Sequence, residues 1–210
     1  MSRWLRWLAL AAPLAPAPAA ELAGWHGIDL PVRLPRKLEL TLHHRTRIRH
    51  QLRHLDDSRA GALLHWSATP RLIPFAGYYY QPQQDVPGLW VQSHRVLVGL
   101  ESPLRVHADS SLTTRLTIER LFYPAPASFN RYRSYARLTI GGRRIAPFFQ
   151  HELLMANSGY YSTRGAGGLR IRLSESVSLD TGYLFESRRA VFGGDRQAIV
   201  TSIRIQKPEK

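Results

Sequence analysis

Hydrophobic and polar side chains alternate along much of the chain from residue 36 onward. The stretch 38–42 reads Leu-Glu-Leu-Thr-Leu, and the stretch 169–173 reads Leu-Arg-Ile-Arg-Leu. Gly, Pro, Asn or Asp residues bound most of these segments, and helical periodicity is not sustained in any of them. Because successive side chains of a strand point to opposite faces, this period of two predicts β-strands with one apolar and one polar face.

We therefore expect an all-β fold, an antiparallel up-and-down β-barrel of about ten strands, with eight to twelve compatible with the pattern. The expected strands are 36–48, 61–69, 71–81, 89–100, 111–122, 131–140, 145–155, 164–173, 177–187 and 197–206. The connections at one end are expected to be long, at 49–60, 82–88, 123–130, 156–163 and 188–196. Those at the other end are short, apart from 102–111. An even strand number would leave both chain ends on the side of the short turns.

The first twenty residues have a different character. Arg3 and Arg6 precede the apolar stretch 7–14, which is followed by the small residues of APAPAA. A charged start, a short apolar run and small residues predict a secretory signal peptide over residues 1–20. The domain expected to fold is then a single β-barrel domain over 21–210.

Charge and cysteine content narrow the function. Removal of Arg3 and Arg6 from the 29 basic residues leaves 27 against 15 acidic ones, a formal charge of +12. Such an excess favours polyanions, and for an exported protein the phosphorylated lipids of the envelope are the expected ones. The chain has no cysteine, which removes disulfides, thiol catalysis and cysteine metal ligands.

Two environments fit an alternating sheet. In a soluble sandwich the apolar faces form the core, whereas in an outer-membrane barrel they meet lipid and the polar faces line the lumen. The signal peptide, the unequal loops and the aromatic clusters favour the transmembrane barrel of a Gram-negative outer membrane, because aromatic residues gather at membrane interfaces. These clusters are Trp66, 77–80, Trp90, Phe122, Tyr123 and 159–161.

On this interpretation the charged faces point into the lumen and form an ionic network. Alternation assigns to it Arg115, Glu119, Arg131, Arg133, Arg137, Arg170, Arg172, Asp180 and Glu186. Inward charges of a small barrel must be paired or hydrated, since burying a lone charge is costly.

Several motifs resemble a known family. The stretches TIERLF (117–122), NRYRSYARLTI (130–140), FQHELLM (149–155) and RGAGGLRIRLSESVSLDTGYLFE (164–186) resemble the proteobacterial family named domain of unknown function 2490. The resemblance covers about 36–206 and implies an outer-membrane β-barrel without an established activity. It also implies that the characteristic inward polar positions are Glu119, Arg133, Arg137, Glu152 and Arg164.

The stretch 43–59 is rich in histidine and arginine. His50 or His54 with Asp56, Asp57 and Ser58 could support hydrolysis, but no Gly-x-Ser-x-Gly elbow occurs, so we assign no catalytic residue. We likewise expect neither a metal nor a cofactor. Four of the five arginines of this stretch are expected at the outer rim, where they could contact lipopolysaccharide phosphates. They are Arg47, Arg49, Arg53 and Arg59.

The sequence thus predicts a non-enzymatic outer-membrane β-barrel, structural or forming a narrow pore that favours anions. Its expected partners are outer-membrane lipid, lipopolysaccharide and the outer-membrane assembly machinery. Nucleic acid is disfavoured by export. The alternatives are a soluble periplasmic β-barrel that binds an acidic ligand, and an outer-membrane lipid hydrolase.

Overall fold

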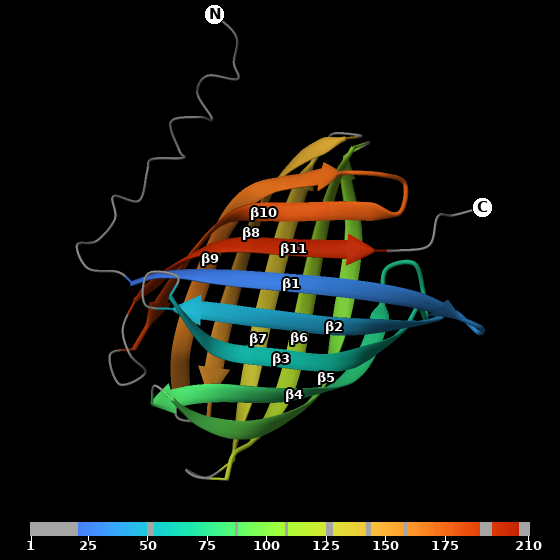
Figure 1. Cartoon of the computed structure of the whole chain (residues 1–210). Coiled ribbons are helices and arrows are strands. Elements are labelled where there is room, and N and C mark those ends of the chain that lie inside the picture. Colours follow the sequence, from blue (N-terminus) through green and yellow to red (C-terminus); the bar gives the residue numbers. More distant parts are fainter. Residues whose placement is uncertain are drawn as a thin grey trace, which may run out of the picture.

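Eleven β-strands close into one barrel in the computed structural model (Figure 1). It describes residues 21–49, 53–86, 88–107, 109–124, 128–141, 144–157, 159–189 and 195–205. The strands are β1 (Glu21–Leu34), β2 (Leu38–Arg49), β3 (His54–Trp66), β4 (Ile73–Val86), β5 (Leu89–His107), β6 (Ser110–Phe122), β7 (Phe129–Ile140), β8 (Ile145–Ala156), β9 (Gly159–Arg172), β10 (Val177–Arg188) and β11 (Arg196–Ile205). The all-β barrel class is confirmed. The predicted signal peptide lies outside the described residues.

An odd number of strands changes how the barrel closes. Strands that follow each other in sequence pair antiparallel, but β1 and β11 pair in parallel, with Ala23 opposite Ala198 and Asp29 opposite Arg204. In Figure 1 the arrowheads of β1 and β11 point the same way, while that of β2 points the opposite way. The expected even strand count was therefore wrong. The first strand starts at one end of the barrel and the last strand finishes at the other.

The strand missing from the sequence prediction is β1. Ile28, Leu30 and Val32 are exposed on its outer side, so it does alternate, but Pro31 interrupts the pattern. A proline lacks the amide that a central strand donates. Pro31 is tolerated because β1 pairs with β11 only as far as Asp29, so that Pro31 has a paired neighbour only on the β2 side.

The connections differ from the expected division into long loops and short turns. The strands extend through much of the sequence assigned to loops: β3 begins at His54, β4 continues to Val86 and β9 begins at Gly159. At the end where β1 starts, which we call the loop end, the connections are 50–53, 87–88, 123–128, 157–158 and 189–195. At the opposite turn end they are 35–37, 67–72, 108–109, 141–144 and 173–176, of similar length.

Burial alternates along the strands with the apolar side outward. On β6, Thr117 and Glu119 are buried, whereas Leu116 is 61 % and Ile118 is 52 % exposed. The same alternation places Arg131 and Arg133 on the inner face of β7, and Glu152 together with the apolar Phe148 and Leu154 on the inner face of β8. The described residues contain no helix that is long and apolar enough to cross a membrane.

A smaller group of inward residues is apolar and packs against glycine. Leu63, Phe75, Tyr79 and Leu97 form a buried cluster inside β3, β4 and β5. The ring of Tyr79 lies across Gly61, where an added Cβ would be 2.4 Å from its Cδ1 atom. Glycine at this position therefore lets an aromatic ring lie flat against the barrel wall.

Candidate functional site

The most connected side chains inside the barrel surround Glu119, a fully buried residue of β6. Arg131 donates from Nε to its Oε2 atom over 2.9 Å, and Arg133 donates from Nη1 to Oε1 over 2.6 Å. Arg95 of β5 approaches the same carboxylate, with Nη1 3.8 Å from Oε2. One carboxylate thus balances part of the charge of three arginines from two flanking strands.

The network continues across the next three strands. Arg133 also donates from Nε to Oε1 of Glu152 over 2.8 Å. Arg164 donates from Nη1 to Oε2 of Glu152 and from Nε to Oε1 of Glu186, each over 2.9 Å. A slip of one residue in strand pairing would turn these charges toward the outside, so the network helps to specify the register. We name this set the ionic belt: Arg95, Glu119, Arg131, Arg133, Glu152, Arg164 and Glu186.

Polar contacts extend the ionic belt around the rest of the wall. Gln81 of β4 accepts a hydrogen bond from Arg95 over 2.6 Å and donates to Asp57 of β3 over 3.2 Å. Arg47 of β2 lies 3.1 Å from the Asp57 carboxylate. The guanidinium carbons of Arg47 and Arg164 lie 4.2 and 5.1 Å from the ring centre of Trp25 on β1. Ten of the eleven strands thus place a side chain in this ring of contacts around the inner wall. At the remaining strand, β11, the buried residue is Ala198.

The interior is more closed toward the loop end than toward the turn end. The belt side chains Glu119, Glu186 and Arg131 are 0, 2 and 8 % exposed. Arg170 and Arg204, which lie near the turn end, have side chains that are 42 and 43 % exposed. Most belt side chains are therefore shielded from solvent, and a solvent-accessible space lies on the turn-end side of the belt.

The remaining predicted interior residues lie toward that space. Arg170 donates from Nε to Oδ1 of Asp180 over 2.8 Å, and Arg137 lies 2.8 Å from Oδ2 of the same carboxylate. Arg115 donates from Nε to Oε2 of Glu101 over 2.9 Å. Arg172 is exposed near the end of β9. The structure thus joins Arg137, Arg170 and Asp180, keeps Arg115 with a different partner and leaves Arg172 at the rim.

The arginines expected to contact lipopolysaccharide require a correction. Arg47 and Arg49 point inward and pair with Asp57 and Asp56, the latter at 2.6 Å, while Arg59 is buried inside the barrel. They point inward because β2 continues to Arg49 and β3 begins at His54, so these residues belong to strands and not to an exposed loop. Of the four, only Arg53 lies in a connection and is exposed.

Several interior residues escaped the sequence prediction. Arg95 lies on a segment whose alternation is weak, and Glu101 lies at the end of that expected strand. Asp56 and Asp57 are both buried although they are adjacent, because the pairing of β2 and β3 shifts between Arg47 and Ile48. Such an irregularity places two consecutive side chains on one side, which strict alternation does not anticipate.

The two aspartates and the serine considered for hydrolysis have other partners. Asp56 and Asp57 are paired with arginines inside the barrel, and Ser58 lies 3.2 Å from His44 in an exposed pair. His50 lies outside the described residues. Among the residues that the structure describes, no group of three histidines or acids is arranged to hold a metal ion.

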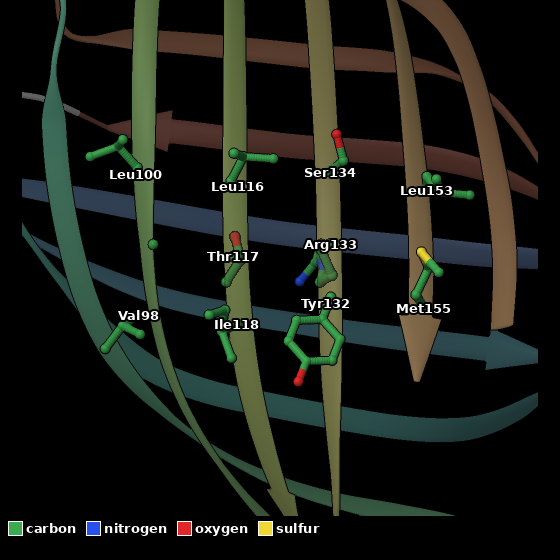
Figure 2. Close-up of a pocket in the computed structure, with 11 residues that line it drawn as sticks. Val98, Leu100, Leu116, Thr117, Ile118, Tyr132, Arg133, Ser134, Leu153 and Met155 are labelled. Atoms are coloured by element: carbon green, nitrogen blue, oxygen red, sulfur yellow. The ribbon is translucent and has the colours of Figure 1, made fainter. Parts of the chain in front are cut away.

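The outer face of β5 to β8 carries a shallow apolar groove of about 510 Å³ (Figure 2). Cross-strand pairs line it, with Val98 opposite Ile118 and Leu100 opposite Leu116. Figure 2 shows these side chains on the near side of the wall, with Tyr132, Leu153 and Met155 on the next two strands. The groove opens on the apolar exterior, and the inner-face residues Thr117 and Arg133 also border it.

The fold and the site define a closed β-barrel with an apolar exterior and a charged interior. Among solved structures, the chain is similar to a NanC porin structure in a rhombohedral crystal form, with a TM-score of 0.53. The two share 11 % sequence identity over 80 % of this chain and 87 % of that one, so the likeness concerns the fold. No family model matches the chain, and no curated protein matches its sequence.

Proposed function

We propose that this chain is an outer-membrane β-barrel of a Gram-negative bacterium whose arginine-rich interior forms a narrow pore that favours anions. The inverted polarity of the barrel carries the proposal: Glu119 is fully buried, and its neighbour Ile118 is 52 % exposed. A barrel that folds in water keeps its apolar side chains inside. An apolar band around the outside would be a large exposed patch in water but matches the hydrocarbon of a bilayer.

The charges inside support the preference for anions. Exposed interior arginines such as Arg45 and Arg204 face the solvent-accessible space, and arginine-lined pores favour anions. The ionic belt narrows the path to the loop end because most of its side chains are buried; that of Arg133 is 25 % exposed. A small conductance is therefore expected, and no catalytic role is assigned.

The envelope partners follow from this position. We propose that the apolar exterior contacts outer-membrane lipid, that the assembly machinery inserts the chain after export, and that Arg53 meets lipopolysaccharide phosphate. Its exposure in the connection between β2 and β3 supports the last contact. The resemblance to domain of unknown function 2490 agrees with the proposal through Glu119, Arg133 and Glu152, which the structure joins in one ion-pair network.

Cell fractionation followed by gel electrophoresis of boiled and unboiled samples tests the membrane position. We expect the protein in the outer-membrane fraction, with a mobility that changes on heating because a closed barrel resists detergent until it is heated. A soluble periplasmic protein without a heat shift would overturn the proposal and favour the alternative of a soluble acidic-ligand binder.

Planar bilayer recording tests the pore. Purified protein should give small, steady currents, and the reversal potential in a salt gradient should show that anions permeate better than cations. Replacement of Arg164 by Ala should increase the conductance, because Arg164 links Glu152 and Glu186 and lies over Trp25. Absence of any current from a heat-modifiable barrel would exclude the pore and leave a structural role.

A further inference from the structure

Arg59 is a buried arginine with no carboxylate partner among the residues that the structure describes. The residue is 8 % exposed, and its Nε atom is buried without a hydrogen-bond partner. Its contact in the described structure is with Tyr79, whose ring centre lies 4.8 Å from the guanidinium carbon. Contact with an aromatic ring does not neutralise a buried cation, so an anion bound next to Arg59 would stabilise the folded barrel.

Three further arginines add positive charge around Arg59. Arg45 is directly opposite Arg59 in the pairing of β2 and β3, and Arg95 is opposite Tyr79 in the pairing of β4 and β5. Arg59 interacts electrostatically with Arg45, Arg47 and Arg95. Like charges directly opposite each other destabilise a sheet unless something screens them.

The nearest carboxylates already have partners. Asp57, two residues before Arg59 on β3, is 3.1 Å from Arg47 and accepts a hydrogen bond from Gln81. Glu119 is held by Arg131 and Arg133 at 2.9 and 2.6 Å, closer than its 3.8 Å approach to Arg95. The described acids of the interior therefore leave the positive charge at Arg59 unmatched.

Solvent reaches this cluster from inside the barrel. Arg45 points inward, since its side chain lies against Gly27 and Ser202, yet it is exposed. Its neighbours on the same face, His43 and Arg47, are much less exposed. An inward residue that is exposed borders a space that water enters, and a small ion can enter the same space.

We propose that Arg45, Arg59 and Arg95 form a binding site for a small oxyanion inside the barrel. Guanidinium groups suit this class of ligand because each presents several donors in a planar fork that matches phosphate or carboxylate oxygens. The inference rests on the proposed function and adds to it a specific site in an otherwise general cationic interior. The ligand is a free ion, since the cluster lies inside the wall whose outer side meets lipid.

Urea unfolding of the purified full-length protein in detergent micelles tests the site. Sodium phosphate, sodium acetate and sodium chloride are compared at equal ionic strength, so that general screening is the same in each arm. Phosphate should raise the unfolding midpoint of the wild type in a saturable manner and more than chloride does, because a ligand that binds the folded state stabilises it. The acetate arm shows whether a carboxylate is also accepted.

The key variant is Arg59→Met, with Arg71→Met on the exposed turn 67–72 as the matched control. Arg59→Met should weaken the apparent phosphate affinity by at least about tenfold, and should unfold at higher urea than the wild type in chloride because an unpaired buried charge is gone. Arg71→Met should behave as the wild type. The exposed Arg45→Met gives a second, milder test, with weakened phosphate protection.

Equal protection by chloride and phosphate, or phosphate protection that survives in Arg59→Met and Arg45→Met, would overturn the site. Either of these two outcomes can be distinguished from failure of the proposed membrane barrel. A protein without a heat-dependent mobility shift fails as a membrane barrel, whereas one that shows the shift but no specific effect of phosphate or acetate fails only as an oxyanion-binding barrel.

Discussion

Glu119 and Arg131 form a buried ion pair between β6 and β7, in which Nε of Arg131 lies 2.9 Å from Oε2 of the fully buried Glu119. Arg133 donates to the other oxygen of the same carboxylate. Since both arginines depend on it, Glu119 is the position at which the ionic belt is most sensitive to change.

Replacement of Glu119 by Gln should lower the free energy of unfolding by about 3 kcal/mol, because removal of one partner leaves buried arginine charge uncompensated. Urea unfolding in micelles measures the change. The control Glu175→Gln lies on the exposed turn 173–176 and should be neutral. Equal midpoints for the two variants would show that the belt contributes nothing to stability.

The apolar exterior leads to a second prediction. Leu116→Arg, near the middle of the outer face of β6, should destabilise the barrel in lipid vesicles by about 2–4 kcal/mol, the cost of arginine at the bilayer midplane. Phe122→Arg, on the same outer face of β6 at the loop end, should cost about 0–1 kcal/mol. Leu116 and Phe122 are 61 and 42 % exposed, so a barrel that folds in water would tolerate both changes alike. That equality would contradict the membrane position.

Sequence alternation predicted the strands whose neighbouring residues differ clearly in polarity. In β6 and β7 each arginine or glutamate of the inner face lies between two residues of the outer face, and Leu, Ile and Tyr are among these outer residues. The strand β1 was missed because Pro31 and two glycines weaken the same signal. The strand β1 closes the barrel by pairing with β11, which lies at the far end of the sequence, so a local pattern does not reveal this pairing.

The direction of many interior side chains was predictable, but their partners were not. Arg164 meets Glu186 because these two residues are paired across β9 and β10, and it also reaches Glu152 of β8. These contacts depend on register between strands, which short sequence segments do not contain. Arg59 shows the consequence, since the same sequence stretch was expected at the surface and lies inside.

The hairpin between β1 and β2 provides a third prediction. The amide of Leu38 donates to the carbonyl of Pro35 over 3.3 Å, and the two residues between them, Arg36 and Lys37, have φ of 58° and 62°. Left-handed backbone at both central positions of a two-residue turn favours Asn and Gly over residues with long side chains.

Lys37→Gly should therefore raise the free energy of unfolding by about 1 kcal/mol, since glycine adopts this backbone without steric cost. Gly141→Ala, at a φ of 56° in another turn, should lower it by a similar amount. Urea midpoints in micelles compare the two. A loss of stability in Lys37→Gly would mean that the side chain contributes more than the strained backbone costs.

The two halves of the interior should contribute differently to ion selectivity, which is the last prediction. Arg170 and Arg204, which are paired inside the barrel near the turn end, have side chains that are 42 and 43 % exposed. A permeating ion meets their charge in solvent, whereas the charges of the ionic belt are largely balanced by their own partners. Arg170→Gln and Arg204→Gln should each lower the preference for anions without changing the heat-dependent mobility.

Reversal potentials in a tenfold salt gradient measure this preference. The control Arg120→Gln replaces an exposed arginine on the outer side of β6, where its side chain donates to Asn130 away from the interior. It should leave selectivity unchanged, and Asp180→Asn should increase the preference for anions because it removes an interior negative charge. An unchanged reversal potential in both Arg170→Gln and Arg204→Gln would mean that ions do not pass these residues, and that the anion preference does not arise in the solvent-accessible half of the barrel.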